Sequence, residues 1–314
     1  EICACLVGSE MCIRDSYSSI QLHSLFSSKT WNKLSFEDKV GACQEVENRY
    51  ALSNGVAPCT IQTAKMQGGT YGYQIGNTIT LNESLLKNGT FIQSYSDTNG
   101  NIQIREIPVI APSWNTLDTI YHEGTHGIQE ATGRMPNTYI RSEADSSLYR
   151  IQGIEKEAFA MGQLKTLEAI SDVEEYTGIC DPSQKDYIEY VKIDSFNSAL
   201  EASVETYNDP NIEQTLNDVI QDRDHGIYRD NGSASYQAIN YLCDNQYYIT
   251  RESNTESSQL LSIDDSSSFY DETNTANSRF STMDGSSSFY DDEFVTSPES
   301  SHTSENTVAN DYGM

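Results

Sequence analysis

The first half of the chain contains two stretches in which hydrophobic residues recur every three or four positions, the spacing of an amphipathic helix. The first begins after Ser35, which can cap a helix together with Asp38, and it ends at residues 54–55, an Asn-Gly pair. Its apolar positions are Val40, Cys43, Val46 and Tyr50. The second is capped by Ser113 and runs to about Thr132, shortly before a glycine and a proline.

Between these two helices the hydrophobic and polar residues alternate, which predicts β-strands. The segments Tyr71–Ile75 and Thr78–Asn82 flank a Gly-Asn pair and form a predicted hairpin. A second turn, at residues 99–100, precedes a strand over Ile102–Ile110. The letters SDTNGN around that turn resemble part of a calcium loop, but Tyr95 would occupy the first ligand position, so a hairpin turn is favoured.

The helical pattern returns after the second long helix. The segments predicted to be helical are Arg141–Ile170, Asp186–Tyr207, Ile212–Asp224 and Ser233–Leu242. Strands that are confined to one part of the chain and helices that fill another predict an α+β fold.

The composition changes from about Arg251 onward. Residues 251–314 contain 13 acidic side chains against 2 arginines, and they are rich in Ser, Thr and Asn. Such a segment cannot bury enough apolar area to offset its chain entropy, so we expect an acidic tail that is disordered. The letters SSSFYD occur twice in it, at Ser266–Asp271 and Ser286–Asp291. They are interpreted as a duplicated linker or, alternatively, as a tandem docking motif for a partner.

The N-terminal letters have a different origin in our interpretation. Residues 5–16, CLVGSEMCIRDS, resemble the in-frame translation of a sequencing adapter, so we expect the natural chain to enter near Tyr17. A missing signal peptide then says nothing about export. The cysteines after residue 16 form no CxxC pair, which argues against a zinc knuckle or a redox motif. They are Cys43, Cys59, Cys180 and Cys243.

Charge and hydropathy narrow the classes of partner. The formal net charge is −28 and the pI is about 4.3, which argues against a nucleic-acid-binding surface, because such a surface needs clustered Lys and Arg. No apolar run of about 18 residues is present, so no membrane span is predicted.

The segment YHEGTHGIQE, at 121–130, carries the candidate chemistry. His122 and His126 lie one turn apart on one helix face, so both imidazoles can reach one zinc ion. Glu123 is rotated by about 100° from His122, where it can act on a water molecule as general base. The alternative is an ordinary helix that contains these residues by chance. The apolar neighbours favour a buried helix instead, and buried ionisable groups need a partner such as a metal ion.

A third protein ligand must come from elsewhere, because Gln129 replaces the glycine of the extended HExxHxxGxxH pattern and no histidine follows. Glu155 and Glu157 both lie in a predicted helix but on different faces. Glu155 shares its face with Ala158 and Gly162, which allow close helix approach, so it is favoured as the ligand. Glu157 remains the alternative.

Residues 31–170 resemble the zincin metallopeptidases whose third zinc ligand is a glutamate, and more narrowly those of bacterial polymorphic toxins and secreted effectors. The resemblance rests on WNKLSFEDKVGACQEVENRYA, YGYQIGNTITLNESLL, LDTIYHEGTHGIQ and YRIQGIEKEAFAMG. It implies Zn²⁺ bound by His122, His126 and Glu155, Glu123 as catalytic base, and endopeptidase activity on a protein or peptide substrate. It also implies a secreted or delivered bacterial effector, and it does not account for residues 171–314.

With this resemblance, the chain is divided into four parts. They are residues 1–16 as adapter, 17–175 as zincin-like metallopeptidase domain, 176–250 as helical extension and 251–314 as the tail. The strand Thr78–Asn82 is expected to pair with substrate as an edge strand. Asp118 is a candidate to orient His122, and Tyr139 and Tyr149 are candidates to stabilise the oxyanion.

Two functions of other classes remain open at this point. One is a degenerate zincin that serves as a binding module, with zinc structural or absent. The other is an interaction protein that acts through its SSSFYD tail.

Overall fold

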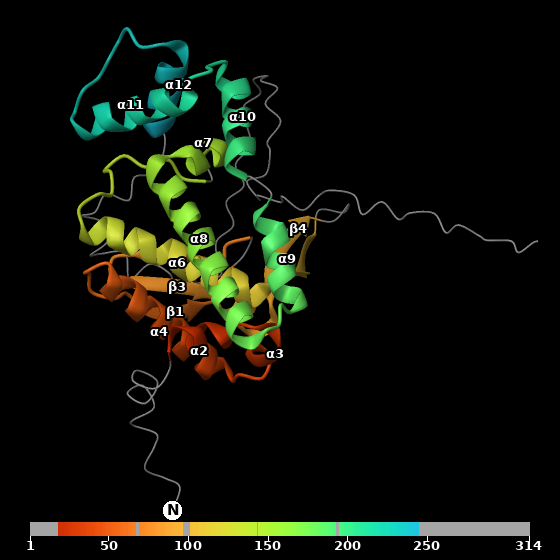
Figure 1. The fold of residues 1–314 in the computed structure, drawn as a ribbon. Coiled ribbons are helices and arrows are strands. Elements are labelled where there is room, and N and C mark those ends of the chain that lie inside the picture. The colour runs from red at the N-terminus through yellow and green to blue at the C-terminus, as the bar shows by residue number, and fades with distance from the viewer. Residues whose placement is uncertain (1–17, 67–68, 97–100, 143, 193–194, 245–314) are drawn as a thin grey trace, which may run out of the picture.

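The computed structural model describes residues 18–66, 69–96, 101–142, 144–192 and 195–244 (Figure 1). The predictions for the adapter-like segment, the turn at 99–100 and the acidic tail with its repeats fall outside these residues. Within the described ranges the protein is a mixed α+β structure, as predicted, and none of its helices is both long and apolar enough to cross a membrane.

Helices and small sheets alternate along the first half of the chain. Its elements are α2 (Ser19–Ser24), α3 (Ser28–Trp31), α4 (Phe36–Ser53), β1 (Thr60–Ala64), β2 (Gly72–Ile75), β3 (Thr78–Asn82), α5 (Glu83–Asn88), β4 (Thr90–Ser96), β5 (Ile102–Pro108) and α6 (Pro112–Ala131). The second half is helical. Its elements are α7 (Ser146–Ile151), α8 (Gly153–Thr177), α9 (Pro182–Val191), α10 (Ser195–Tyr207), α11 (Ile212–Asp224) and α12 (Ala234–Asp244).

The main sheet has three strands in the order β1-β3-β2. The predicted hairpin is confirmed as β2 and β3, which are antiparallel, whereas β1 pairs with β3 in parallel and was not predicted. Because β3 is the central strand, the prediction that Thr78–Asn82 is an edge strand is wrong. Its polar residues Thr80 and Asn82 are buried and hydrogen-bonded inside the protein: Gln62 donates to Thr80 (2.8 Å), and Asn82 donates to the carbonyl of Thr70 (2.9 Å). The free edges of this sheet are therefore β1 and β2.

Several helix boundaries differ from the predicted ones for local reasons. Ser113 does not cap α6; the helix starts at Pro112, and Ala111 occupies the cap position with φ 45°. The helix predicted over residues 141–170 is interrupted at Gln152, which has an extended ψ of 141°. The side chain of Gln152 bonds both the N–H and the carbonyl of Ile140, so it joins a loop to the start of α8. The helix predicted over Asp186–Tyr207 is likewise divided, into α9 and α10.

Buried apolar side chains form two clusters. The larger one surrounds the main sheet and includes Trp114 of α6 and Tyr187 of α9. The smaller one joins Leu148 of α7 to residues of α10, α11 and α12, the helices in the upper part of Figure 1. Helix α9 packs on the first cluster and α7 on the second. The domain limits at residues 16/17, 175/176 and 250/251 stay predictions.

Helix α8 crosses directly over α6, and this crossing positions the candidate site (Figure 1). Ala158 is fully buried, and a Cβ atom added at Gly162 would lie 2.1 Å from Oδ1 of Asp118 on α6. The close approach that these small residues predict is confirmed.

Substitution of Gly162 by alanine should therefore destabilise the fold. The added methyl group would clash with backbone and side-chain atoms of Asp118. Overpacking of this kind lowers the free energy of unfolding by about 1–3 kcal/mol. Gly153→Ala in the same helix is the matched control, because its Cβ would meet nothing closer than 3.9 Å. Urea unfolding of both variants tests this, and equal stabilities would contradict the packing described.

Candidate metal centre

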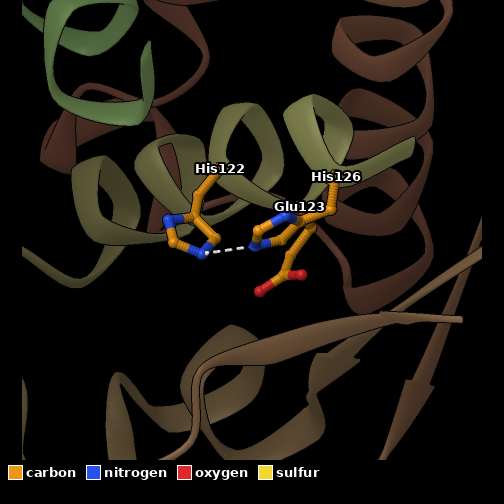
Figure 2. Close-up of side chains that lie close together, drawn as sticks. All are labelled: His122, Glu123 and His126. Atoms are coloured by element: carbon orange, nitrogen blue, oxygen red, sulfur yellow. Dashed lines mark hydrogen bonds between the residues drawn. The ribbon is translucent and has the colours of Figure 1, made fainter. Parts of the chain in front are cut away.

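Helix α6 carries two histidines and a glutamate that converge at one point (Figure 2). Nε2 of His122 and Nε2 of His126 are 3.2 Å apart, as the helical spacing predicts. One nitrogen of each histidine and a carboxylate oxygen of Glu123 lie within 4.8 Å of one another, and the structure thus contains a buried His–Glu–His group that could hold a metal ion. Each of the three residues is buried, with only 7–8% of its surface exposed.

Glu155 reaches the same point from the first turn of α8 and is fully buried. Its Oε1 lies 3.2 Å from Nε2 of His126, and its Oε2 lies 3.5 Å from Nε2 of His122. Oε2 has no hydrogen-bond partner. Of the two glutamates considered from the sequence, the structure thus brings Glu155 to the histidines.

The spacing of these atoms fits a metal ion. With bonds of about 2.0–2.1 Å, the ligands of a tetrahedral zinc ion lie roughly 3.3–3.4 Å from one another. Nε2 of His122 and Nε2 of His126 are 3.2 Å apart, and each lies 3.2–3.5 Å from one of the two carboxylate oxygens of Glu155. The carboxylate oxygen without a hydrogen-bond partner is a second feature that a cation would satisfy.

Electrostatic interactions within the group are strong. Burial lowers the pKa of His126, but the hydrogen bond and charge of Glu155 outweigh it and raise this pKa to about 9. Burial acts to raise the pKa of Glu155, and the two imidazoles together hold it below the usual range of a glutamate. A fully buried carboxylate thus requires adjacent positive charge, which a divalent cation could supply as well as a protonated imidazole.

Glu123 has a different environment from Glu155. Burial raises its pKa, whereas the two histidines act to lower it. The backbone N–H of Gln74, on the edge strand β2, also acts to lower this pKa. A carboxylate with a raised pKa beside a possible metal site is suited to accept a proton near neutral pH.

Two tyrosines line the site next to Glu155. The hydroxyl of Tyr139 donates to Oε1 of Glu155 at 2.5 Å, and the ring of Tyr149 lies 6.1 Å from that of Tyr139. Burial, and then the charge of Glu155, raise the pKa of both phenols, which therefore stay protonated and able to donate. In this arrangement Tyr139 holds Glu155, and the oxyanion role of either tyrosine stays a prediction.

Asp118 lies one turn before His122, but it bonds elsewhere. Its Oδ2 accepts from the hydroxyl of Tyr187 (2.9 Å), and its Oδ1 faces Gly162. Burial raises the pKa of Asp118 to about 6, although the hydrogen bond from Tyr187 and the electrostatic interaction with His122 act to lower it. Asp118 thus interacts electrostatically with His122. Among the described residues, no hydrogen bond joins the two side chains.

Comparisons with known proteins returned no match: no family model, no curated protein and no solved structure matches this chain. The resemblance to zincins therefore rests on the four stretches of sequence named above, and the structure adds a His–Glu–His group that could bind a metal ion.

Glu47 of α4 is a buried carboxyl group that the sequence did not single out. It is 1% exposed and accepts from the N–H of Cys59 at 2.9 Å, while its Oε2 has no hydrogen-bond partner. A Cβ atom at Gly124, inside the motif, would lie 2.6 Å from that oxygen. Glycine at position 124 thus lets α4 pack closely against the motif helix.

Burial raises the pKa of Glu47 from 4.5 to about 7, despite the hydrogen bond from Cys59. The folded state therefore binds this proton more tightly than the unfolded chain, and the contribution of Glu47 to stability falls as the pH rises from 4.5 to about 7. Relative to the natural protein, Glu47→Gln should gain stability over this range, by at most about 3 kcal/mol. Urea unfolding at pH 5 and pH 8 measures it, with Glu37→Gln at an exposed position of α4 as control. If the free energy of unfolding changes with pH in the same way in all three proteins, the pKa of Glu47 is not raised by burial.

Proposed function

We propose that this chain is a zinc-dependent peptidase in which His122, His126 and Glu155 bind the ion and Glu123 is the general base. The observation that carries the proposal is the convergence of two imidazoles and a fully buried carboxylate at 3.2–3.5 Å, with a second carboxylate beside them.

Zinc is the metal that best suits this set of donors. Two imidazole nitrogens and one carboxylate oxygen are the ligand type of catalytic zinc sites, which use three protein ligands and keep a further position for water or substrate. Hard cations such as Ca²⁺ and Mg²⁺ prefer sites made of oxygen atoms alone. When bound, zinc supplies Lewis-acid polarisation of a carbonyl group and lowers the pKa of a water molecule.

The other roles in the reaction would belong to side chains around the ion. Glu123 accepts the proton of the attacking water and later delivers it to the leaving amine, for which its raised pKa is suited. Glu155 keeps its charge in the absence of solvent because the imidazoles and the hydroxyl of Tyr139 surround it. The ring of Phe159 packs 4.4 Å from that of His122 and limits the positions it can adopt.

Substrate would lie along β2 rather than along β3. Strand β2 is an edge strand that packs against α6, and the side chain of Gln74 donates to Glu130 of α6 at 2.8 Å. The backbone N–H of Gln74 acts to lower the pKa of Glu123. Its side chains Tyr73 and Ile75 are 39% and 49% exposed. An extended peptide can add to such an edge through backbone hydrogen bonds, which would place its scissile bond close to Glu123.

A second candidate function is a binding module that holds a structural ion. The low exposure of His122, Glu123 and His126 favours it, because structural zinc sites are closed. Delivery as a bacterial effector is proposed only from the resemblance of residues 31–170.

Substitution of individual glutamates separates the two candidates. Glu123→Gln removes the base but no ligand, so it should keep about one zinc per chain and lose roughly 10²–10⁴-fold in peptide hydrolysis. Glu155→Gln weakens a metal bond and should lose zinc in dialysis, with activity partly restored by added zinc. Glu168→Gln is the matched control on the exposed side of α8, where Glu168 pairs with Lys165. Zinc is measured by atomic absorption and hydrolysis with a library of unstructured fluorogenic peptides.

The outcomes discriminate clearly. If the natural protein binds zinc but cleaves no peptide, and so behaves like the Glu123→Gln variant, the binding module is favoured. Natural protein that binds no zinc, or a Glu123→Gln variant that loses zinc while Glu155→Gln retains it, would overturn the assignment of roles.

A further inference from the structure

Gln129 lies one turn beyond His126 on α6, and every hydrogen-bonding group of its side-chain amide has a partner. It is fully buried. Its Nε2 donates to the carbonyl oxygen of Ile154 and to Oε2 of Glu157, both at 3.0 Å. Its Oε1 lies 2.8 Å from Nδ1 of His126.

These contacts determine which way the amide faces. A carbonyl oxygen and a carboxylate can only accept hydrogen bonds, so the NH₂ group of Gln129 must point at Ile154 and Glu157. Its oxygen is then the atom that faces His126. Because that oxygen can only accept, Nδ1 of His126 must carry a proton and donate it. In the neutral imidazole the lone pair is then on Nε2, the atom that faces His122 and Glu155.

The contacts continue outward to the protein surface. Both oxygens of Glu157 accept from Nη1 of Arg134, at 2.9 and 2.8 Å. The side chains of this ion pair are 40% and 47% exposed, so the pair itself is worth little, and its contribution is to hold one carboxylate oxygen toward Gln129. Helix α8 thus supplies Glu155 to the histidines and, two residues later, Glu157 to the amide that contacts one of them.

We propose that Gln129 is a positioning residue, which fixes His126 in the Nδ1–H tautomer and in the orientation that presents Nε2 to a metal ion. Glu157 and Arg134 hold Gln129 in place. The inference rests on the proposed function, because it assumes that Nε2 of His126 binds zinc. It gives a physical task to the glutamine that stands where the extended HExxH pattern has glycine, and to the glutamate that was the alternative ligand.

The size of the effect should decrease outward along the chain of contacts. Loss of a group that orients a ligating histidine typically weakens metal binding 10–100-fold. Gln129→Met keeps the length of the side chain but removes both the acceptor and the donors, so it should fall in that range. Glu157→Ala leaves a half-exposed position that water can enter, and a loss of only a few-fold is expected.

The test compares natural protein, Gln129→Met, Glu157→Ala and a matched control. The control is Gln214→Met, because Gln214 is a glutamine on α11 whose amide donates to Asp218 at an exposed site. Zinc affinity is measured by competition with a chromophoric chelator. Long-range ¹H–¹⁵N spectra of the zinc-loaded proteins report which nitrogen of His126 carries the proton, and circular dichroism reports folding.

The inference predicts an Nδ1–H signal for His126 in the natural protein and in Gln214→Met, with equal zinc affinities. It predicts a 10–100-fold weaker affinity in Gln129→Met, with the signal shifted or broadened. Natural protein without zinc would refute the proposed function. Zinc bound equally well by Gln129→Met, with an unchanged signal, would refute the inference and leave the proposed function intact. If Gln129→Met does not fold, Glu157→Ala takes its place, and unchanged affinity together with an unchanged His126 signal would then overturn the inference.

Discussion

The contact between the carboxylate of Glu155 and the imidazoles of His122 and His126 is the interaction on which the rest of this site depends. A carboxylate that is fully buried is costly unless positive charge and hydrogen-bond donors surround it. Here the two imidazoles and the hydroxyl of Tyr139 do so, although one carboxylate oxygen still has no hydrogen-bond partner. The contact can form only because α8 approaches α6 closely, which Gly162 permits. The fold and the candidate chemistry therefore share one structural requirement.

Helix α6 is accordingly packed on several sides at once. Strand β2 approaches it through Gly72, where an added Cβ would lie 2.9 Å from a methyl group of Thr119. Helix α4 approaches through Gly124, and a Cβ added at Gly127 would lie 2.9 Å from the Sγ atom of Cys59, just before β1. The small residues between and beside the two histidines thus let neighbouring elements surround the helix, while its ionisable side chains meet partners from β2 and α8. This arrangement explains how a helix that carries His122, Glu123 and His126 can be buried in an acidic protein.

The parts of this structure that follow from local periodicity could be predicted from the sequence. The convergence of His122 and His126 needs only the helical repeat, and the same repeat places Glu155 on the face of Ala158 and Gly162. The parts that depend on distant contacts could not. Strand β1 carries one well-buried apolar residue, Ile61, and is defined by parallel pairing with β3. The central position of β3, and the contacts of Glu47 and Gln129, likewise depend on residues far away in the chain.

The most direct test of the central claim is the position of the metal itself. Crystals of the zinc-loaded protein would be measured with X-rays on both sides of the zinc absorption edge, so that anomalous difference density marks zinc alone. The account predicts one peak per chain, at about 2.0–2.2 Å from Nε2 of His122, Nε2 of His126 and an oxygen of Glu155. A peak at any other group, or no peak between α6 and α8 in crystals that contain stoichiometric zinc, would contradict it.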